Sequence, residues 1–515
     1  MTEPAGTCCF VLHTHLPWVA HAGAWPVGEE WLHQAWSASY LPIVQLLERL
    51  ADEGRRDVLT LGVTPVVAAM LDDPYLLREF HLWLGDWQAR AWELGSGGGP
   101  HAPLAAYEHQ RATAALACFE TRWQHGGSPL IRGLADSGVV ELLGGPATHP
   151  FQPLVVADRL VDFQLSVGLD DAALRLGRRP RGIWAPECGY APGLEERYAA
   201  ADVGHFLVDG PTLLGSIGPG ATGAAWRVGD TDVVAFGRDL DVTYRVWSPR
   251  TGYPGGRWYR DFHHFDHPSG FRAFRVTGRR IDEKKPYDPV AGHAATERDA
   301  QDFVRHVRER VDQLARERGR PGLVVVAYDT ELFGHWWHEG PLWLERVLRL
   351  LPEAGVRVTT LSGAIEAGHV DGDATLRPGS WGSGKDWRVW EGGAVAELVD
   401  ESRDIQQRLL DVTNKLVRGR VGRLPALDQL AREAFLVMSS DWAFCVSKDT
   451  AADYARSRHR THADRFGQLA GLLESRRGHA AELLAGRLRE LDGPFGHLDA
   501  RALAVPGGVV ARSTG

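Results

Sequence analysis

Two acidic residues, Glu187 and Asp329, each stand at the end of a short apolar run and could perform nucleophilic or acid–base chemistry. Two carboxylates on either side of a sugar linkage can cleave it, because one attacks the anomeric carbon while the other protonates the leaving oxygen. An acid at a strand end often only caps the following helix, so neither residue identifies the chemistry alone. The pair, with tryptophan and histidine close to each member, suggests glycoside chemistry.

Histidines follow two other predicted strands. His13 and His15 are separated by one residue, and the period of two in a strand places both imidazoles on one face. His149 ends a glycine-rich stretch that begins at residue 144. These side chains form either a metal site or a hydrogen-bonding floor for a ligand. The chain also has 19 tryptophans, whose rings could stack on sugars near turns, although most tryptophans pack in cores.

The elements that must position these residues alternate between strands and helices. Short buried strands are predicted near residues 8–13, 58–62, 139–143, 180–184, 205–209, 232–236 and 323–328. Helical patterns separate several of them, including 36–50 and 295–318. This alternation predicts an α/β fold with a parallel sheet, either a barrel or a doubly wound sheet, with Glu187 and Asp329 at its carboxyl-terminal rim.

Two stretches have helical patterns without strand candidates, so the sequence predicts three parts. Residues 74–125 are expected to form a helical subdomain inserted into a catalytic barrel of residues 1–375. Residues 376–515 are expected to form a C-terminal helical domain. The glycine-rich stretch between the strands at 205–209 and 232–236 is expected to be a loop, and residues 238–255 a strand joined to a turn.

Composition narrows the class of protein. The 515 residues carry a net charge of −9, and the 57 basic residues are dispersed, which argues against nucleic-acid binding. Neither a signal peptide nor an apolar run of about 18 residues is visible, so neither export nor a membrane partner is indicated. Five scattered cysteines without a CxxC pair fit a reducing cytoplasm and argue against a structural zinc or disulfide framework.

Five motifs occur together in one order along the chain. They are His13-x-His15-Leu-Pro-Trp, Gly145-x-Ala-Thr-His149, Trp184-x-Pro-Glu187-Cys, Tyr328-Asp329-x-Glu-Leu-Phe-Gly-His335-Trp336-Trp and Trp381-Gly-x-Gly with Trp387 and Trp390. In this order they resemble the signature regions of glycoside hydrolase family 57, most closely its 1,4-α-glucan branching enzymes. The resemblance runs from about residue 8 to Trp442.

The resemblance implies a (β/α)7 barrel with an inserted helical subdomain and a C-terminal all-α domain that completes the cleft. It implies retention without a metal or other cofactor, with an α-1,4-glucan such as amylose or glycogen as substrate. Glu187 would be the nucleophile and Asp329 the acid that later acts as base, with the carboxyls roughly 5 Å apart.

Binding residues also follow from the resemblance. Four histidines would line the sugar subsite nearest the cleaved bond: His13, His15, His149 and His335. Five tryptophans would line the donor and acceptor groove, and Asp441 would make a polar contact there: Trp247, Trp336, Trp381, Trp390 and Trp442.

One feature departs from the pattern of the branching members, which carry a long loop with a tyrosine over the acceptor side. Here no tyrosine occurs between Tyr198 and Tyr244, and residues 213–225 are short and glycine-rich. Transfer to a glucan competes with transfer to water. We therefore predict α-1,6 branching with a larger share of hydrolysis than in relatives that carry the loop.

Other readings of the same residues remain. An α-amylase-like hydrolase or a 4-α-glucanotransferase of the same family would use the same carboxylates. A metal-dependent amidohydrolase would bind metal through His13, His15, His149 and Asp329, which leaves Glu187 and the tryptophan-rich turns unexplained. A glycan-binding scaffold without activity would have no need for a carboxylate pair.

Overall fold

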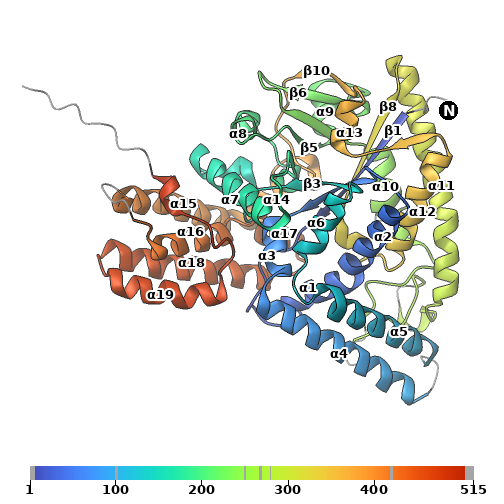
Figure 1. The fold of residues 1–515 in the computed structure, drawn as a ribbon, viewed down its shortest axis with the longest axis horizontal. Helices are drawn as coiled ribbons and strands as arrows, with labels where there is room; N and C mark the ends of the chain where they lie inside the picture. The colour runs from blue at the N-terminus through green and yellow to red at the C-terminus, as the bar shows by residue number, and fades with distance from the viewer. Residues whose placement is uncertain are drawn as a thin grey trace, which may run out of the picture.

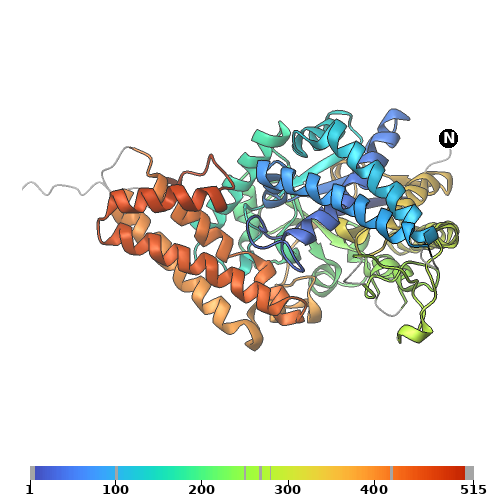
Figure 2. The same ribbon diagram turned by 90° about the horizontal axis from the view of Figure 1, so that it is seen from below.

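The computed structural model describes residues 6–98, 102–248, 251–265, 270–278, 280–417 and 422–504 (Figure 1). A sheet with helices around it forms the larger part of the molecule. The helices near the C-terminus, from α15 to α19, form a separate group on one side of it (Figures 1 and 2).

Seven parallel strands form the centre of the larger part. They are β1 (Gly6–Thr14), β2 (Leu59–Val63), β3 (Val140–Gly144), β4 (Gly182–Ile183), β5 (His205–Asp209), β7 (Val234–Arg238) and β8 (Gly322–Asp329). Their order is β8-β1-β2-β3-β4-β5-β7. The main-chain N–H of Asp239, just after β7, donates to the carbonyl of Val325 in β8 at 2.8 Å. This bond brings the two end strands together, so the predicted (β/α)7 barrel is confirmed.

The strands are buried because helices cover them. All nine residues of β1 are buried, which matches the continuous apolar run expected of a parallel strand covered on both faces. Helices follow or precede each strand: α1 (Glu29–Ala35), α2 (Leu41–Asp52), α3 (Pro65–Leu71), α6 (Ser128–Asp136), α7 (Asp158–Leu176), α8 (Leu194–Ala200), α10 (Leu240–Trp247), α11 (Pro289–Arg318), α12 (Gly340–Glu353) and α13 (Leu361–Glu366). A π-helical turn, Trp36–Tyr40, joins α1 to α2.

Three further strands extend the sheet. β6 (Ala225–Val228) pairs antiparallel with β7, and β10 (Val370–Ala374) pairs with β6. β9 (Val356–Val358) pairs with the beginning of β1. The stretch that was expected to be a loop therefore contains β6 as well as the short helix α9 (Gly210–Ser216). Its glycines concealed both elements, because β6 is short and gains its hydrogen bonds only from β7 and β10.

Two helices stand where a helical insertion was expected. They are α4 (Pro74–Ser96) and α5 (Ala102–Cys118), which pack against each other along the lower edge in Figure 1. Asp73 caps α4 by accepting hydrogen bonds from the main-chain N–H groups of Tyr75 and Leu76. The limits of this insertion as a domain stay a prediction.

Six helices follow the sheet in the chain. They are α14 (Arg388–Glu391), α15 (Ala396–Val417), α16 (Pro425–Val437), α17 (Ser440–Lys448), α18 (Ala452–Glu474) and α19 (Gly478–Leu491). From Ala426 to Val437 every residue of α16 is buried, so this helix is central to the group. The helical pattern predicted from residue 401 to 491 is present. Whether residue 376 begins a domain stays a prediction.

Two local expectations were wrong. β4 has two residues rather than about five, because Pro186 and the turn at Glu187 end the extended backbone early. The stretch after Arg238 forms α10 rather than a turn, since Asp239 accepts a hydrogen bond from the main-chain N–H of Val242 and so caps a helix. Among the described helices, none has the length and apolar composition needed to cross a membrane.

Candidate active site

Glu187 lies in a tight turn directly after β4. Its backbone is left-handed, with φ 61°, and Cys188 after it has φ 49°. Such conformations cost of order 1–3 kcal/mol and persist where the surroundings enforce them. The turn buries the carboxyl, which is 7% exposed. Trp381 Nε1 donates to Oε2 at 2.8 Å and Ser440 Oγ donates to Oε1 at 2.7 Å.

Two opposing effects act on the charge of Glu187. Burial raises its pKa to about 7, while the hydrogen bonds from Ser440 and Trp381 act in the opposite direction. A carboxylate that accepts two hydrogen bonds is held in one orientation with its charge stabilised. The two donors therefore offset part of the effect of burial on this carboxylate.

Asp329 ends β8, in register with His13 of the neighbouring β1. Burial, followed by repulsion from Glu331 and Glu187, raises its pKa well above the ordinary range. Within the described residues no hydrogen bond to the Asp329 carboxyl is formed. Both acids are buried, but Glu187 has hydrogen-bond donors where Asp329 has carboxylate neighbours, a difference that favours the proton on Asp329.

Three of the predicted histidines meet beside Glu187. His13 Nε2 lies 3.1 Å from His149 Nε2, and His149 Nδ1 lies 3.0 Å from Ser440 Oγ. The His15 and His149 rings stack with centroids 3.7 Å apart. Burial lowers the pKa of His13 and of His149 well below the usual value, so both are neutral and can exchange hydrogen bonds with a polar ligand.

His15 differs because it pairs with a carboxylate. Its Nε2 lies 2.9 Å from Asp441 Oδ2. Burial is the largest single effect and disfavours the charged imidazole, but the attraction and hydrogen bond of Asp441, together with attraction to Glu187 and Glu331, outweigh it and raise the pKa of His15. Asp441 was predicted as a polar contact in the groove. In the structure Asp441 lies on α17 and contacts His15, one of the three histidines beside Glu187.

His335 lies in the loop that follows β8. Its main-chain N–H donates to Ser39 Oγ at 3.0 Å. Burial and the nearby Arg272 guanidinium lower the pKa of His335 to about 3, so this ring is neutral as well.

The five predicted tryptophans fall into two groups. Trp247 is 39% exposed, and its ring centroid lies 5.6 Å from that of the half-buried Trp336. Trp381 is half-buried, and the Arg238 guanidinium lies 5.2 Å from its ring centroid. These three rings present surface to a ligand.

Trp390 and Trp442 are each only 1% exposed. Trp390 stacks on Phe151 at 4.7 Å, and Trp442 Nε1 donates to the Leu436 carbonyl at 2.8 Å. Both rings line a pocket of about 480 Å³ between the barrel and the C-terminal helices. They present almost no surface to solvent, so any effect on substrate is exerted through the shape of the site.

Sequence reasoning missed Glu331 and Tyr40. Glu331 is 2% exposed, and its Oε1 accepts hydrogen bonds from Tyr40 OH at 2.5 Å and from the His15 main-chain N–H at 3.3 Å. Burial raises the pKa of Glu331 to about 7. Glu331 stands two residues after Asp329, and this position could have marked it as a candidate. Nothing in the sequence around Tyr40 connected that residue to Glu331.

Ser440 was also missed, although it is the residue that joins Glu187 to His149. It lies next to Asp441, which was predicted as a site residue, so its position was available from the sequence. Trp184 is a second omission, since its ring stacks on His13 with centroids 4.3 Å apart. Trp184 therefore packs against the histidine cluster through the ring of His13.

The segment 213–225 begins within α9, directly after β5. The Arg377 main-chain N–H donates to Ser216 Oγ at 2.9 Å, and the Arg318 guanidinium, at the end of α11, donates to the Gly223 carbonyl. The two ends of the segment are thus held by different parts of the barrel. That the segment is a shortened lid over the acceptor side stays a prediction.

His15, His149 and Asp441 offer ligand atoms within 4.8 Å of one another, a spacing that could hold a metal ion. The set expected for an amidohydrolase also contained His15 and His149, but its other two members were His13 and Asp329 rather than Asp441. The His15–Asp441 bond and the His149–Ser440 bond already use atoms of this set.

Fold and site together define a class of protein. A seven-stranded parallel barrel brings one hydrogen-bonded carboxylate and one proton-bearing carboxyl to the same rim, beside neutral imidazoles and aromatic rings. This is the arrangement of a barrel enzyme that acts on glycosidic bonds.

The chain belongs to glycosyl hydrolase family 57, whose family model matches residues 9–374. A second model, the C-terminal region of 1,4-alpha-glucan branching enzymes, matches residues 401–502. The chain is 52% identical to a probable 1,4-alpha-glucan branching enzyme of Mycobacterium tuberculosis, over 97% of this chain and 98% of that protein.

Solved structures agree with this placement. The branching enzyme of Pyrococcus horikoshii superposes with a TM-score of 0.91 at 30% identity, covering 98% of this chain and 97% of that one. An alpha-amylase of Thermotoga maritima superposes with a TM-score of 0.86 at 27% identity, covering 98% of this chain and 100% of that one.

Proposed function

We propose that this protein is a 1,4-α-glucan branching enzyme that cleaves an α-1,4 bond and transfers the released chain to a glucan 6-hydroxyl. The observation that carries the mechanism is the contrast between the two acids. Glu187 accepts two hydrogen bonds as a carboxylate, while Asp329 keeps its proton. Relatives named as branching enzymes along the whole chain support this activity over hydrolysis.

In the first step, Glu187 attacks the anomeric carbon and forms a covalent ester with the glucan. The bond from that carbon to the leaving oxygen breaks, and Asp329 gives its proton to the oxygen. Forming the ester removes the negative charge of Glu187. The pKa of Asp329 then falls, because one source of repulsion has been lost, and Asp329 becomes the base for the second step.

In the second step, Asp329 takes a proton from the 6-hydroxyl of an acceptor glucan. The hydroxyl oxygen attacks the anomeric carbon and releases Glu187, giving an α-1,6 linkage with overall retention. Water can take the place of the acceptor. The ratio of branching to hydrolysis depends on which nucleophile reaches the ester, and a barrier difference of about 1.4 kcal/mol changes that ratio tenfold.

The binding roles assigned to the other residues are part of this proposal. His13, His15, His149 and His335 would bond the hydroxyls of the sugar at the cleaved bond. Trp247, Trp336 and Trp381 would stack on glucose units, as aromatic faces do on sugars. The protein is further proposed to act in the cytoplasm without a nucleic-acid partner, with domain limits at residues 74–125 and 375.

The test is incubation with amylose, followed by proton NMR of α-1,6 linkages and a count of new reducing ends. We expect α-1,6 linkages to form, and Glu187→Ala and Asp329→Ala to form almost none while remaining folded. New reducing ends without new α-1,6 linkages would replace the proposal with a hydrolase. The same assay with EDTA tests the amidohydrolase reading. A metal-dependent enzyme would lose activity with EDTA and regain it with zinc, whereas we expect EDTA to leave the activity unchanged.

A further inference from the structure

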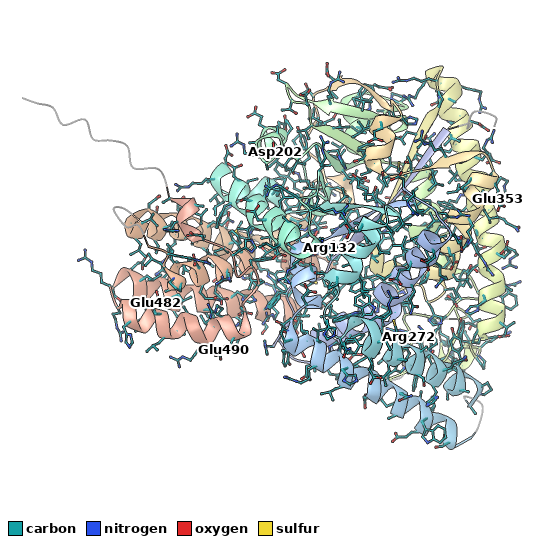
Figure 3. The ribbon with its side chains drawn as sticks, in the orientation of Figure 1. Arg132, Asp202, Arg272, Glu353, Glu482 and Glu490 are labelled. Atoms are coloured by element: carbon teal, nitrogen blue, oxygen red, sulfur yellow. The ribbon has the colours of Figure 1, made fainter. Side chains whose placement is uncertain are left out.

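A pocket of about 680 Å³ opens beside the loop that carries His335 and Trp336. On its other sides it is lined by α1 and the π-helical turn, by α4 and α5, and by Arg260, Phe262, Phe265, Gly270, Phe271 and Arg272. Figure 3 shows Arg272, one of the lining residues, beside the two inserted helices. The pocket therefore continues from the catalytic loop into the helical insertion.

In α4 and in α1, the residues that line this pocket lie on one side of each helix. Trp83, Trp87 and Arg90 of α4 follow the spacing i, i+4, i+7, which places them on one side of the helix. Glu30 and Gln34 are likewise one turn apart in α1. Trp92, by contrast, is 66% exposed on α4 and does not line the pocket.

The aromatic rings in the pocket are held by buried carboxylates. Trp83 Nε1 donates to Glu30 Oε2 at 2.8 Å, and Trp87 Nε1 donates to Glu108 Oε2 at 3.2 Å. Glu30 is 8% exposed and Glu108 is 3% exposed. Glu108 also forms ion pairs with Arg260 and Arg111, and Glu30 also accepts a hydrogen bond from Gln34, so both carboxylates are fixed by protein partners. Groups fixed in this way are prepared to bind without further ordering, which is typical of a ligand site.

The lining selects a class of ligand. Arg272 Nε donates to the Phe262 carbonyl at 2.9 Å, and its two terminal nitrogens form no hydrogen bond to any described residue. Indole faces combined with guanidinium donors and carboxylate acceptors suit a neutral polyol with apolar ring faces, since such a molecule both stacks and exchanges hydrogen bonds. Four guanidinium groups line the pocket, those of Arg90, Arg111, Arg260 and Arg272, against the carboxylates of Glu30 and Glu108. Binding of an anion is therefore the outcome against which the neutral ligand is tested.

We propose that this pocket is a glucan subsite, which binds glucose units of the substrate chain beyond those at the cleaved bond. It would thereby favour long chains and influence the length of the chain transferred. The inference rests on the proposed function for its substrate, an α-1,4-glucan.

Binding is measured by calorimetry in the inactive Glu187→Ala protein, with maltooligosaccharides from maltose to maltoheptaose. Trp83→Ala should weaken maltoheptaose binding on the order of tenfold and leave maltose within about twofold, because one stacking face is lost. Gln34→Ala should act in the same direction by about threefold, since it removes one polar contact. Trp92→Ala, the same substitution on the same helix outside the pocket, should change neither affinity.

Trp83 and Gln34 both donate to Glu30, so the folding of each variant is checked by thermal unfolding. Gln34→Ala decides if Trp83→Ala does not fold. The proposal is overturned if the variants lose equal affinity for maltose and maltoheptaose, or if they lose no affinity for maltoheptaose. It is also overturned if the Glu187→Ala protein binds a sugar phosphate more tightly than maltoheptaose. If the wild type makes no α-1,6 linkages but long-chain binding depends on Trp83, the subsite stands and the branching activity falls.

Discussion

At the scale of single residues, the site separates two carboxyls by what surrounds each of them. Glu187 is given hydrogen-bond donors, whereas Asp329 is given carboxylate neighbours. Two carboxyls of the same chemistry are thus suited to the two roles proposed for them, a charged nucleophile and a protonated acid. Ser440 contributes to the difference through its hydrogen bond to Glu187, and Glu331 contributes through its charge near Asp329.

Ser440→Ala should move the acidic limb of the kcat/KM profile to higher pH. The substitution removes a hydrogen bond that stabilises the Glu187 carboxylate, so the pKa of Glu187 rises above its present value of about 7. A shift of about one pH unit is expected for a charge-assisted bond of that kind. Ser447→Ala is the control, because Ser447 lies on the same helix and donates to the Val389 carbonyl instead. An unmoved acidic limb would show that Ser440 does not tune Glu187.

Glu331→Gln should move the alkaline limb to lower pH, again by about one unit. The pKa of Glu331 is raised to about 7, so above that pH it is charged and opposes ionisation of Asp329. Glutamine removes the charge, and Asp329 then loses its proton earlier. Tyr40→Phe should give a smaller shift in the same direction, since loss of its hydroxyl raises the pKa of Glu331. A purely structural role for Glu331 would lower kcat without moving the limb.

At the scale of elements, α17 connects the C-terminal helices to the barrel site. It begins at Ser440, whose side chain reaches Glu187, and includes Asp441, which reaches His15. The Trp442 ring anchors this helix in the core. The position of α17 therefore decides the geometry of the nucleophile.

Trp442→Ala should destabilise the fold by about 3–5 kcal/mol, because it leaves a large cavity. Thermal unfolding would show this as a lower Tm, and turnover should fall with it as α17 shifts. Trp247→Ala is the matched comparison, since Trp247 is 39% exposed. It should leave Tm almost unchanged and raise KM. A Trp442→Ala protein of normal Tm that shifts turnover toward hydrolysis would instead support direct contact with the acceptor.

At the scale of the whole molecule, the barrel and the C-terminal helices are joined by polar bonds between distant residues. His15 and Asp441 are 426 positions apart, and Trp18 Nε1 donates to Asp492 Oδ1 at 2.9 Å over 474 positions. Both bonds start from the loop after β1. The active site therefore depends on how the two parts pack.

Asp441→Asn should destabilise the molecule most at intermediate pH. The pKa of His15 is raised, so its contribution is present below the unfolded value of about 6.5 and fades as pH rises through the folded value. The pKa of Asp441 is lowered, so its contribution is present above about 3.8 and is lost as pH falls. Between about pH 4 and 6.5 a loss of about 2 kcal/mol is expected. A pH-independent difference in denaturant unfolding would exclude the ion pair.

The sequence by itself determined the local order of the molecule and indicated the residues proposed for the chemistry. Apolar runs of strand length predicted most strands of the barrel, and helical periodicity predicted the C-terminal helices, because both signals depend on near neighbours. The glycosidic character of the site followed from acids at strand ends and from motifs in order. Short elements such as β6 were not predicted, because β6 is extended only through its hydrogen bonds to the neighbouring strands β7 and β10.

Only the tertiary structure decided the state and surroundings of each group. Ser440 and Glu187 are 253 positions apart, and the charge on each acid depends on donors and carboxylates brought together by packing. Trp390 and Trp247 look alike in the sequence, yet one is buried and the other presents its ring to solvent. The contact of Gly223 with Arg318 of α11 joins residues 95 positions apart and is visible only in the structure. Sequence periodicity carries no information on such contacts, since burial and proximity across the chain arise when the elements pack.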